Sequence, residues 1–518
     1  MIPPELCAAA AESQRPIFRT HCYNGFELPE VNNGQIDLPG LSSLPSPSVV
    51  PCLGMPISPA RTIAFDVLLR VATQDAYADE SLRAALGETV RAEDAGLATE
   101  LTLGVLRWQR MLDFLIDRKL TKQVKSLDIE VRIALRIGVY QLYFLERVPA
   151  HAAVHESVEL VKKARKRSAA PLVNAVLRKT AKEPIPAGAP GENFASLLPK
   201  NLPQAESFGI QYSHPTWLVE RWLRAFGEDR MKALLMANNR VPTLSGYALD
   251  PKCREDAIAS LLKAGCVVEP GRLLRNAWTL RGGNPAASEA VRQGWVAIQD
   301  EASQAVAHLL SVDPGNNVLD LCAAPGGKTL LLSLATGPEG HVIATDLHPN
   351  RMRAMAERFE RAGIRNIESI ALDGAKPLPF ERRFDRILVD APCSGTGTLA
   401  RHPEIRWRLR AEDLADLHTR QVNLLRNALQ TLAPGGRLVY STCSLEPEEN
   451  EHVVEDALSG GLYGFRIVPQ CDALVSALRD DITQESLIGA DGFFRTFPPK
   501  DGTDGFFAAV IERNSEVL

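Results

Sequence analysis

The strongest constraint on the fold comes from the C-terminal half, where short apolar stretches alternate with helical patterns from about residue 291 to residue 518. Helices separate the first five of these stretches, and strands joined through helices lie parallel in one sheet with helices on its faces. The strand candidates are Asn317–Leu321, His341–Asp346, Ile367–Leu372, Phe384–Asp390, Arg437–Ser441 and Phe506–Ile511. The sequence therefore predicts a doubly wound, Rossmann-like α/β domain over 291–518.

Upstream of this domain the pattern changes. Residues 58–183 carry only helical periodicity, beginning with Ser58 as a helix cap and Pro59 in the first helical turn, and they predict a compact all-α domain. A linker is expected over 184–200, where Pro, Ala and Gly are frequent. Residues 201–290 predict a small α+β domain, with helices at 216–226, 228–238 and 255–264 and strands at Ser245–Leu249 and Val267–Glu269.

The first 57 residues differ from the rest in composition. They are rich in Pro, Ser and Gly and have no sustained periodicity, so a disordered leader is expected there. Met55 stands just before the first helical pattern, which makes it an alternative start of translation.

The cysteines and charges narrow the class of protein. The nine cysteines are scattered and no CxxC pair occurs, so the sequence predicts a cytoplasmic protein without a metal site or a disulfide framework. No apolar run reaches the length of a membrane helix. The net charge of −5 does not indicate a general nucleic-acid binder, but two basic runs, 162–167 and 401–410, are candidates for phosphate contact.

A turn of small residues follows the first strand of the α/β domain. Cys322-Ala323-Ala324-Pro325-Gly326-Gly327-Lys328 leads directly into an apolar helix, so backbone can approach a ligand beside the free N–H donors of the helix start. Asp346 ends the second strand, where it is placed to accept hydrogen bonds from ribose hydroxyls. Asp373 and Asp390 end the next two strands at the same edge of the sheet. These residues favour a nucleoside cofactor such as S-adenosylmethionine.

A P-loop is the alternative interpretation of this turn, because Gly327-Lys328-Thr329 is present and Ile387–Asp390 resembles a Walker B strand. A P-loop requires a glycine five residues before Gly327, and Cys322 stands there. Pro325 also removes an N–H donor that should contact phosphate. The sequence therefore disfavours an NTPase.

Cysteines follow the fourth and fifth strands. Cys393 and Cys443 both fall in loops at the carboxyl edge of neighbouring strands, where ligands bind in such sheets. A thiolate that adds to carbon 6 of cytosine makes carbon 5 nucleophilic toward a sulfonium methyl, and a base must then remove the carbon-5 proton so that the thiol can leave. Asp390 near N3 could stabilise the charge that develops on the ring. Spacing alone does not decide which cysteine attacks.

Together these motifs resemble the NOL/NOP/Sun family of RNA 5-methylcytosine methyltransferases. The resemblance covers about 295–512 and is carried by Gln299–Gln304, Cys322–Thr329, Asp390–Gly397, Arg401–Trp407, Thr442–Ser444 and Asp504–Phe507. It implies that Cys443 is the nucleophile and that Cys393 assists product release. It also implies that Cys322–Lys328, Asp346, Asp373 and Asp390 line the S-adenosylmethionine pocket. Lys328 is expected to be a surface lysine at the start of a helix.

The N-terminal domain indicates which type within this family the chain resembles. The segments 148–158 and 173–178 are similar to the NusB-like domain of the bacterial RsmB (Sun, Fmu) type, and Ser213–Trp217 fits the same type. Members of that type methylate cytosine 967 of 16S ribosomal RNA in standard numbering, so the resemblance implies this RNA as the partner. His151, His155 and His214 are expected to serve in capping or packing.

Two alternatives remain open at this point. A transfer-RNA substrate would keep the same chemistry and change only the partner. A non-catalytic RNA-binding or antitermination adaptor would explain the helical domain but would leave both thiols without a use.

Overall fold

The computed structural model describes residues 57–87, 90–120, 126–183, 191–381, 383–459, 464–469 and 471–515. The expected leader before residue 57, the alternative start at Met55 and the first part of the expected linker, 184–190, lie outside the described residues. Within the described part of the chain, no helix combines the length and the apolar character that crossing a membrane requires.

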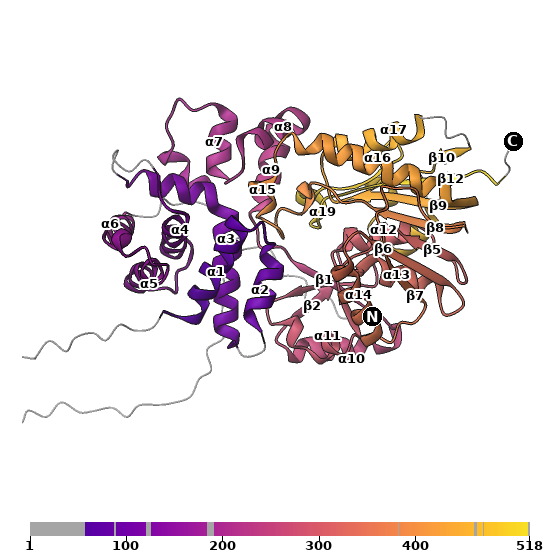
Figure 1. Ribbon diagram of the computed structural model, residues 1–518, viewed down its shortest axis with the longest axis horizontal. Coiled ribbons are helices and arrows are strands. Elements are labelled where there is room, and N and C mark those ends of the chain that lie inside the picture. Colours follow the sequence, from indigo (N-terminus) through magenta and orange to yellow (C-terminus); the bar gives the residue numbers. More distant parts are fainter. Residues whose placement is uncertain are drawn as a thin grey trace, which may run out of the picture. The chain divides into compact units, whose positions relative to one another are not determined.

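In the described part of residues 57–183 the regular secondary structure is helical, as the periodicity predicts (Figure 1). Its helices are α1 (Pro59–Thr73), α2 (Ala78–Leu86), α3 (Ala92–Asp117), α4 (Ile129–Phe144), α5 (Ala150–Lys163) and α6 (Ala170–Thr180). Pro59 opens α1 as expected, but the hydroxyl of Ser58 accepts a hydrogen bond from Arg61 Nη1 (3.0 Å) instead of capping the helix. The expected linker also contains structure, because residues 192–197 form a 3-10 helix whose Phe194 is buried in the core of these helices.

The middle of the chain combines helices with a small antiparallel sheet. The helices α7 (Gln204–Gln211), α8 (Thr216–Phe226), α9 (Glu228–Asn238), α10 (Arg254–Lys263) and α11 (Glu289–Arg292) accompany strands β1 (Leu244–Ala248), β2 (Val267–Pro270), β3 (Ala277–Arg281) and β4 (Val296–Ile298). The strand order is β2-β3-β1-β4. The sequence pattern predicts β1 and β2 but misses β3 and β4, and β4 carries this sheet past residue 290.

The C-terminal sheet has eight strands among the described residues. They are β5 (Asn317–Asp320), β6 (His341–Asp346), β7 (Ile367–Ala371), β8 (Phe384–Asp390), β9 (Leu432–Thr442), β10 (Phe465–Ile467), β11 (Phe494–Thr496) and β12 (Phe506–Arg513). Their order is β10-β12-β9-β8-β5-β6-β7, with β11 paired to β12. Strands β5 to β9 pair in parallel and β12 runs antiparallel to β9. The predicted mainly parallel, doubly wound sheet is therefore confirmed.

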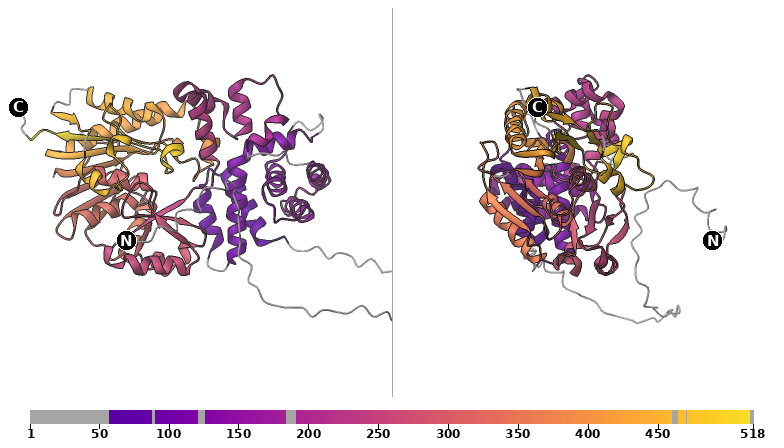
Figure 2. Two further views of the ribbon diagram at one scale, coloured as in Figure 1. Left: turned by 180° about the vertical axis from the view of Figure 1, so that it is seen from behind. Right: turned by 90° about the vertical axis from the view of Figure 1, so that its right-hand side faces the viewer.

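Helices cover both faces of this sheet (Figures 1 and 2). Consecutive strand residues point to opposite faces, so Val318 and Leu388 pack with α12 (Glu301–Leu309) and α18 (Asp472–Ala477). Leu319 and Ile387 pack with α16 (Asp413–Thr431) and α17 (Glu451–Ser459) on the other face. Helices α13 (Gly327–Thr336) and α14 (Pro349–Arg361) lie beside β5 and β6. Because both faces are covered, ligands can reach the sheet only at its edges.

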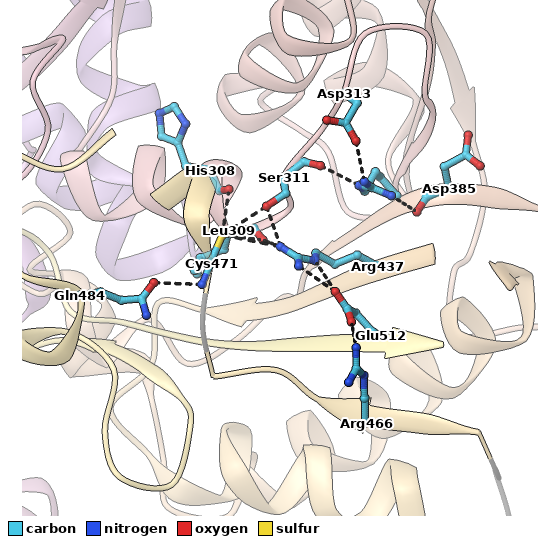
Figure 3. Close-up of polar contacts among 11 residues, drawn as sticks. His308, Leu309, Ser311, Asp313, Asp385, Arg437, Arg466, Cys471, Gln484 and Glu512 are labelled. Atoms are coloured by element: carbon cyan, nitrogen blue, oxygen red, sulfur yellow. Dashed lines mark hydrogen bonds and ion pairs between the residues drawn. The ribbon is translucent and has the colours of Figure 1, made fainter. Parts of the chain in front are cut away.

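A polar cluster fixes the end of the sheet away from the carboxyl ends of β8 and β9 (Figure 3). Arg437 in β9 contacts Glu512 in β12 (2.7 Å) and donates to the hydroxyl of Ser311 (2.6 Å), and Arg466 contacts the same carboxylate (2.8 Å). The buried thiol of Cys471 lies 3.3 Å from the Ser311 hydroxyl. Arg437 precedes the end of β9 by five residues, about 16 Å of extended chain. The cluster therefore joins strands and takes no part in the site at the opposite edge.

Candidate active site

Two neighbouring strands deliver the two predicted thiols to one place. Strands β8 and β9 pair in parallel with Asp390 opposite Ser441, so the residues that follow both strands leave the sheet at the same edge. Cys393 and Cys443 lie there with their sulfur atoms 3.4 Å apart. Both are free cysteines and both are partly exposed. The structure thus brings together the two side chains that the sequence singles out for covalent chemistry.

A buried carboxylate holds the two thiol loops together. Glu449 accepts hydrogen bonds from the backbone N–H of Ser394 (2.8 Å), the hydroxyl of Ser444 (2.5 Å) and the amide of Gln421 (3.0 Å). It also accepts a bond from the Ser394 hydroxyl. Each thiol is therefore followed in sequence by a serine that is tied to the same acid. Glu449 cannot be recognised from the sequence, because nothing in its spacing distinguishes it from the acidic residues beside it.

A close backbone approach joins the first thiol loop to the final strand. The N–H of Gly397 donates to the carbonyl of Cys443 (2.9 Å), and the N–H of Gly505 donates to the carbonyl of Gly397 (2.8 Å). A Cβ atom on Gly397 would lie 2.1 Å from the carbonyl oxygen of Gly505. Glycine is therefore required at position 397, and the Asp390–Gly397 and Asp504–Phe507 segments meet at this point.

The surroundings of two cysteines at this edge, Cys393 and Cys322, raise the pKa of their thiols. The hydrogen bond with Cys443, followed by burial, raises the pKa of Cys393 well above the usual range of a thiol. Burial, followed by the charge of Asp320, raises the pKa of Cys322 in the same direction. Cys393 and Cys322 are therefore held as neutral thiols.

The predicted cofactor turn runs from β5 into α13. Gly326 has a φ of +93°, and a Cβ atom there would lie 2.6 Å from the side chain of Met355. A cavity of about 170 Å³ opens beside the turn. Its lining includes Gln299, Asp320, Cys322, Ala323, Ala324, Pro325, Gly327, Lys328, Arg358 and Asp390. The turn and the end of β8 thus share one cavity.

Lys328 is not the surface lysine that its position at the start of a helix suggests. It is buried, and its ammonium contacts Asp390 Oδ2 at 2.7 Å. The hydroxyl of Ser441 donates to the other oxygen of Asp390 (2.8 Å). Both carboxylate oxygens of Asp390 are therefore oriented from two sides, between the cofactor turn and the thiols.

Asp346 ends β6 and Asp373 follows the end of β7 by two residues, but neither belongs to the lining of that cavity. Asp346 accepts a hydrogen bond from the N–H of His348 (3.0 Å) and lies 3.6 Å from Arg351. Asp373 accepts a bond from the N–H of Ala375 (3.1 Å). Each retains unused acceptor positions, because a carboxylate accepts about four hydrogen bonds.

Asp320 is a member of the site that the sequence analysis overlooks. It ends β5 and is 1% exposed, and burial raises its pKa to about 7. Thr329 donates to one of its oxygens (2.7 Å), while the other has no partner among the described residues. Gln299 Oε1, in the same lining, is also buried without a partner there. The sequence feature that could have identified Asp320 is its acidic side chain within the predicted strand Asn317–Leu321, beside apolar residues.

These two unsatisfied acceptors test whether the residues fit S-adenosylmethionine. Buried acceptors without partners are costly, and a ligand that brings N–H or O–H donors would satisfy them. The ammonium and ribose hydroxyls of S-adenosylmethionine are such donors. The cavity beside the turn therefore suits that cofactor.

Two arginines of the basic run 401–410 bind other protein groups, which corrects the expectation of phosphate contact for Arg401 and Arg406. Arg401 contacts Asp300 and Asp504, each at 2.7 Å. Arg406 is fully buried and donates to the carbonyls of Ser213 (3.1 Å) and Leu399 (3.1 Å), and burial lowers its pKa to about 9. These guanidinium groups bind protein, not solvent.

The three histidines expected to serve in capping or packing differ in burial. His214 is fully buried, its Nδ1 lies 2.7 Å from the carbonyl of Tyr212, and burial lowers its pKa, in agreement with a packing role. His151 and His155 are exposed on α5, whose N-cap position is Pro149 and has no side-chain cap hydrogen bond, so neither histidine packs in the core or occupies the N-cap position.

Family comparisons match both halves of the chain. The model of the family described as 16S rRNA methyltransferase RsmB/F matches residues 307–512, and that of the NusB family matches residues 58–182. The chain is 36% identical over 445 residues to the ribosomal RNA small subunit methyltransferase B of Pseudomonas putida, covering 84% of this chain and 97% of that protein. It is 30% identical over 457 residues to the probable ribosomal RNA small subunit methyltransferase B of Bacillus subtilis, covering 88% and 98%.

Solved structures agree with this comparison. The crystal structure of PH0851 superimposes with a TM-score of 0.73 at 26% identity, covering 89% of this chain and 100% of that one. A methyltransferase homologue from Pyrococcus horikoshii superimposes with a TM-score of 0.51 at 26% identity, covering 60% of this chain and 99% of that one.

Proposed function

Because the chain belongs to the ribosomal RNA small subunit methyltransferase B family and is therefore an RNA methyltransferase, we propose that it methylates carbon 5 of a cytosine in 16S ribosomal RNA. The expected target is cytosine 967 in standard numbering, and the expected compartment is the cytoplasm. The observation that carries the proposal is the pair of thiols, 3.4 Å apart, at the edge of the sheet that also holds the cofactor turn.

We assign the attack to Cys443. Its thiolate forms a bond to carbon 6 of the cytosine, and the displaced electron pair makes carbon 5 nucleophilic. S-adenosylmethionine, when bound, supplies the electrophilic methyl group. The residues proposed to hold it are Cys322, Ala323, Ala324, Pro325, Gly326, Gly327, Lys328, Asp346, Asp373 and Asp390. Asp320 and Gln299 join this set because they offer buried acceptors in the same cavity.

We assign the release step to Cys393. After methyl transfer a proton must leave carbon 5, and the electron pair of that C–H bond then re-forms the ring double bond as the Cys443 sulfur departs from carbon 6. Cys393 lies beside the nucleophile. Its raised pKa keeps it a thiol, so it can donate its proton to the Cys443 sulfur as that sulfur leaves carbon 6, and the Cys393 thiolate accepts the proton from carbon 5 in the same step.

Asp390 has a supporting role in this proposal. Lys328 and Ser441 orient its two oxygens, so the carboxylate is fixed between the cofactor cavity and the thiols. We place it near N3 of the ring, where a proton held between the carboxyl group and N3 neutralises the negative charge that develops on the ring during attack.

The test is transfer of labelled methyl from S-adenosylmethionine to unmodified 16S RNA and, separately, to bulk transfer RNA. Bisulfite sequencing maps the product. Methylation of one cytosine of 16S RNA supports the proposal in full. Methylation of transfer RNA alone would keep the chemistry and overturn the substrate, and no transfer to either RNA would favour a non-catalytic adaptor.

A further inference from the structure

A second, larger cavity opens beside Cys393 and shares no lining residue with the cavity at the cofactor turn. Its volume is about 600 Å³, within the range of pockets that hold ligands. The lining consists of Tyr77, Cys393, Ser394, Ile405, Arg408, Leu409, Asp413, Asp416, Leu417 and Arg420. Tyr77 belongs to the N-terminal helical segment, and every other member follows β8. The helical segment therefore contributes one side chain to the space beside Cys393.

The backbone on both sides of Tyr77 is anchored to the catalytic segment. The N–H of Ala78 donates to Glu404 Oε1 (3.1 Å), and Arg408 donates to the carbonyls of Ala76 and Val71. Arg408 also lies over the Tyr77 ring, 5.5 Å from its centroid. The position of the tyrosine is thus fixed by the same segment, 404–408, that lines the cavity.

The Tyr77 side chain is nevertheless 52% exposed. An exposed aromatic residue is unremarkable where its backbone is free. Here the backbone is bonded on both sides and the ring faces a cavity that reaches Cys393. A held aromatic ring with an open face is what proteins use to stack an unpaired base of RNA.

Helix α16 contributes one guanidinium group to the lining of this cavity, together with two carboxyl groups. Asp413, Asp416, Leu417 and Arg420 lie on one face of α16, at helical spacing. Arg420 is exposed and has neither an ion pair nor a hydrogen bond within the described part of the chain. An unpaired guanidinium beside a thiol pocket suits an RNA phosphate, which it can bind through two parallel N–H donors.

We propose that Tyr77 completes the RNA site by stacking on the nucleotide next to the target cytosine, while Arg420 binds the phosphate that joins the two nucleotides. The helical segment then contributes directly to the substrate pocket and not only to general RNA affinity. This inference rests on the proposed function.

The test compares Tyr77→Ala, Tyr77→Leu and Tyr77→Phe in the full-length protein, with S-adenosylmethionine and unmodified 16S RNA. Loss of one stacked base should raise KM for RNA roughly 5- to 100-fold in the Ala and Leu variants with little change in kcat. The Phe variant should stay within about twofold of the parent, because it keeps the ring. Leu keeps apolar bulk and so separates stacking from packing.

Arg420→Gln should raise KM for RNA and reduce the slope of log affinity against log salt by about 1. The matched control is Arg292→Gln, which removes an exposed arginine from α11 and should change neither quantity. All variants should bind S-adenosylmethionine as the parent does.

An unchanged KM in both Tyr77→Ala and Tyr77→Leu would overturn the inference while the proposed function stands. If the parent protein methylates no RNA, the proposed function fails. The stacking role is then decided by equilibrium binding of the same RNA, and equal affinities of the parent and Tyr77→Ala would overturn it as well.

Discussion

Cys443 and Cys393 are adjacent in space but are expected to fail in different ways when removed. Cys443→Ala removes the attacking sulfur, so methyl transfer should fall by at least roughly 1,000-fold while cofactor affinity is retained. Cys253→Ala, a partly exposed cysteine in the small α+β part of the chain, is the control and should remain active. Single-turnover transfer of labelled methyl measures the difference, and residual activity near that of the control would remove Cys443 from the role of nucleophile.

Cys393→Ala should methylate the base once and then stall, because the neighbour that assists release is missing. A covalent protein–RNA adduct that carries the transferred methyl should accumulate and survive denaturing electrophoresis. Normal multiple turnover without an adduct would contradict the assignment of release to Cys393.

Asp320 makes stability depend on pH. Its pKa is about 7 in the folded protein and near 4 in an unfolded chain. The folded state therefore holds the proton more tightly, and the resulting stability is complete below about pH 4 and is lost as the pH rises through about 7. Asp320→Asn cannot ionise, so its free energy of unfolding should fall less between about pH 5 and pH 7.5. Urea unfolding without cofactor measures this, and the same fall in both proteins would contradict the prediction.

At the scale of elements, Glu449 is the connection between the loops that follow β8 and β9. Glu449→Gln replaces the carboxylate that accepts bonds from Ser394 and Ser444, and loss of hydrogen bonds to a buried charge costs about 1.5–3 kcal/mol each. We expect a lower melting temperature and at least a roughly tenfold lower kcat with unchanged cofactor affinity. Glu455→Gln, on the exposed face of α17, is the control and should change neither quantity. A parent-like kcat would show that the loops hold their geometry without this acid.

The elements also show where sequence reasoning succeeds. Strands β6 and β8 begin and end at the predicted residues, because apolar runs bounded by acidic or small residues are unambiguous in a sheet covered on both faces. Strands β4, β10 and β11 are missed because each has only three residues, too few to show an alternating pattern. Strand β3 is missed because four of its five residues are buried, so the alternation of a half-buried strand is absent.

The site, like the strands, contains residues that the sequence predicts and residues that it does not. Cys393, Cys443 and the 322–328 turn are predictable because each directly follows a recognisable strand. Glu449 and Asp320 are not, since their importance comes from burial and from partners distant in the fold, which spacing does not encode. Tyr77 lies more than 300 residues before the thiols, so only the folded chain reveals that it faces them.

At the scale of the whole molecule, the remaining basic run is the candidate for general RNA affinity. Lys162, Lys163, Arg165 and Arg167 are exposed, and their surface ion pairs are weak enough to be exchanged for phosphates. Replacing all four by Gln should weaken binding of any RNA and reduce the slope of log affinity against log salt by up to about 3. Replacing Lys252 and Lys263, also exposed, is the control. Unchanged affinity in a filter-binding titration would show that the run is a solvated surface.

The buried Arg406 has a consequence for how such proteins can be recombined. Its guanidinium is held by carbonyls of residues 213, 238 and 399, and the indole of the adjacent Trp407 donates to the carbonyl of Leu106 (2.7 Å). A chimera that takes residues before 240 from one relative and the remainder from another would inherit Arg406 and its carbonyl partners at residues 213 and 238 from different parents. Recombination between such genes is therefore expected to have kept Arg406 and its carbonyl partners from the same parent. An engineered fusion will need to take residues 399–408 from the same relative as the helices that they contact.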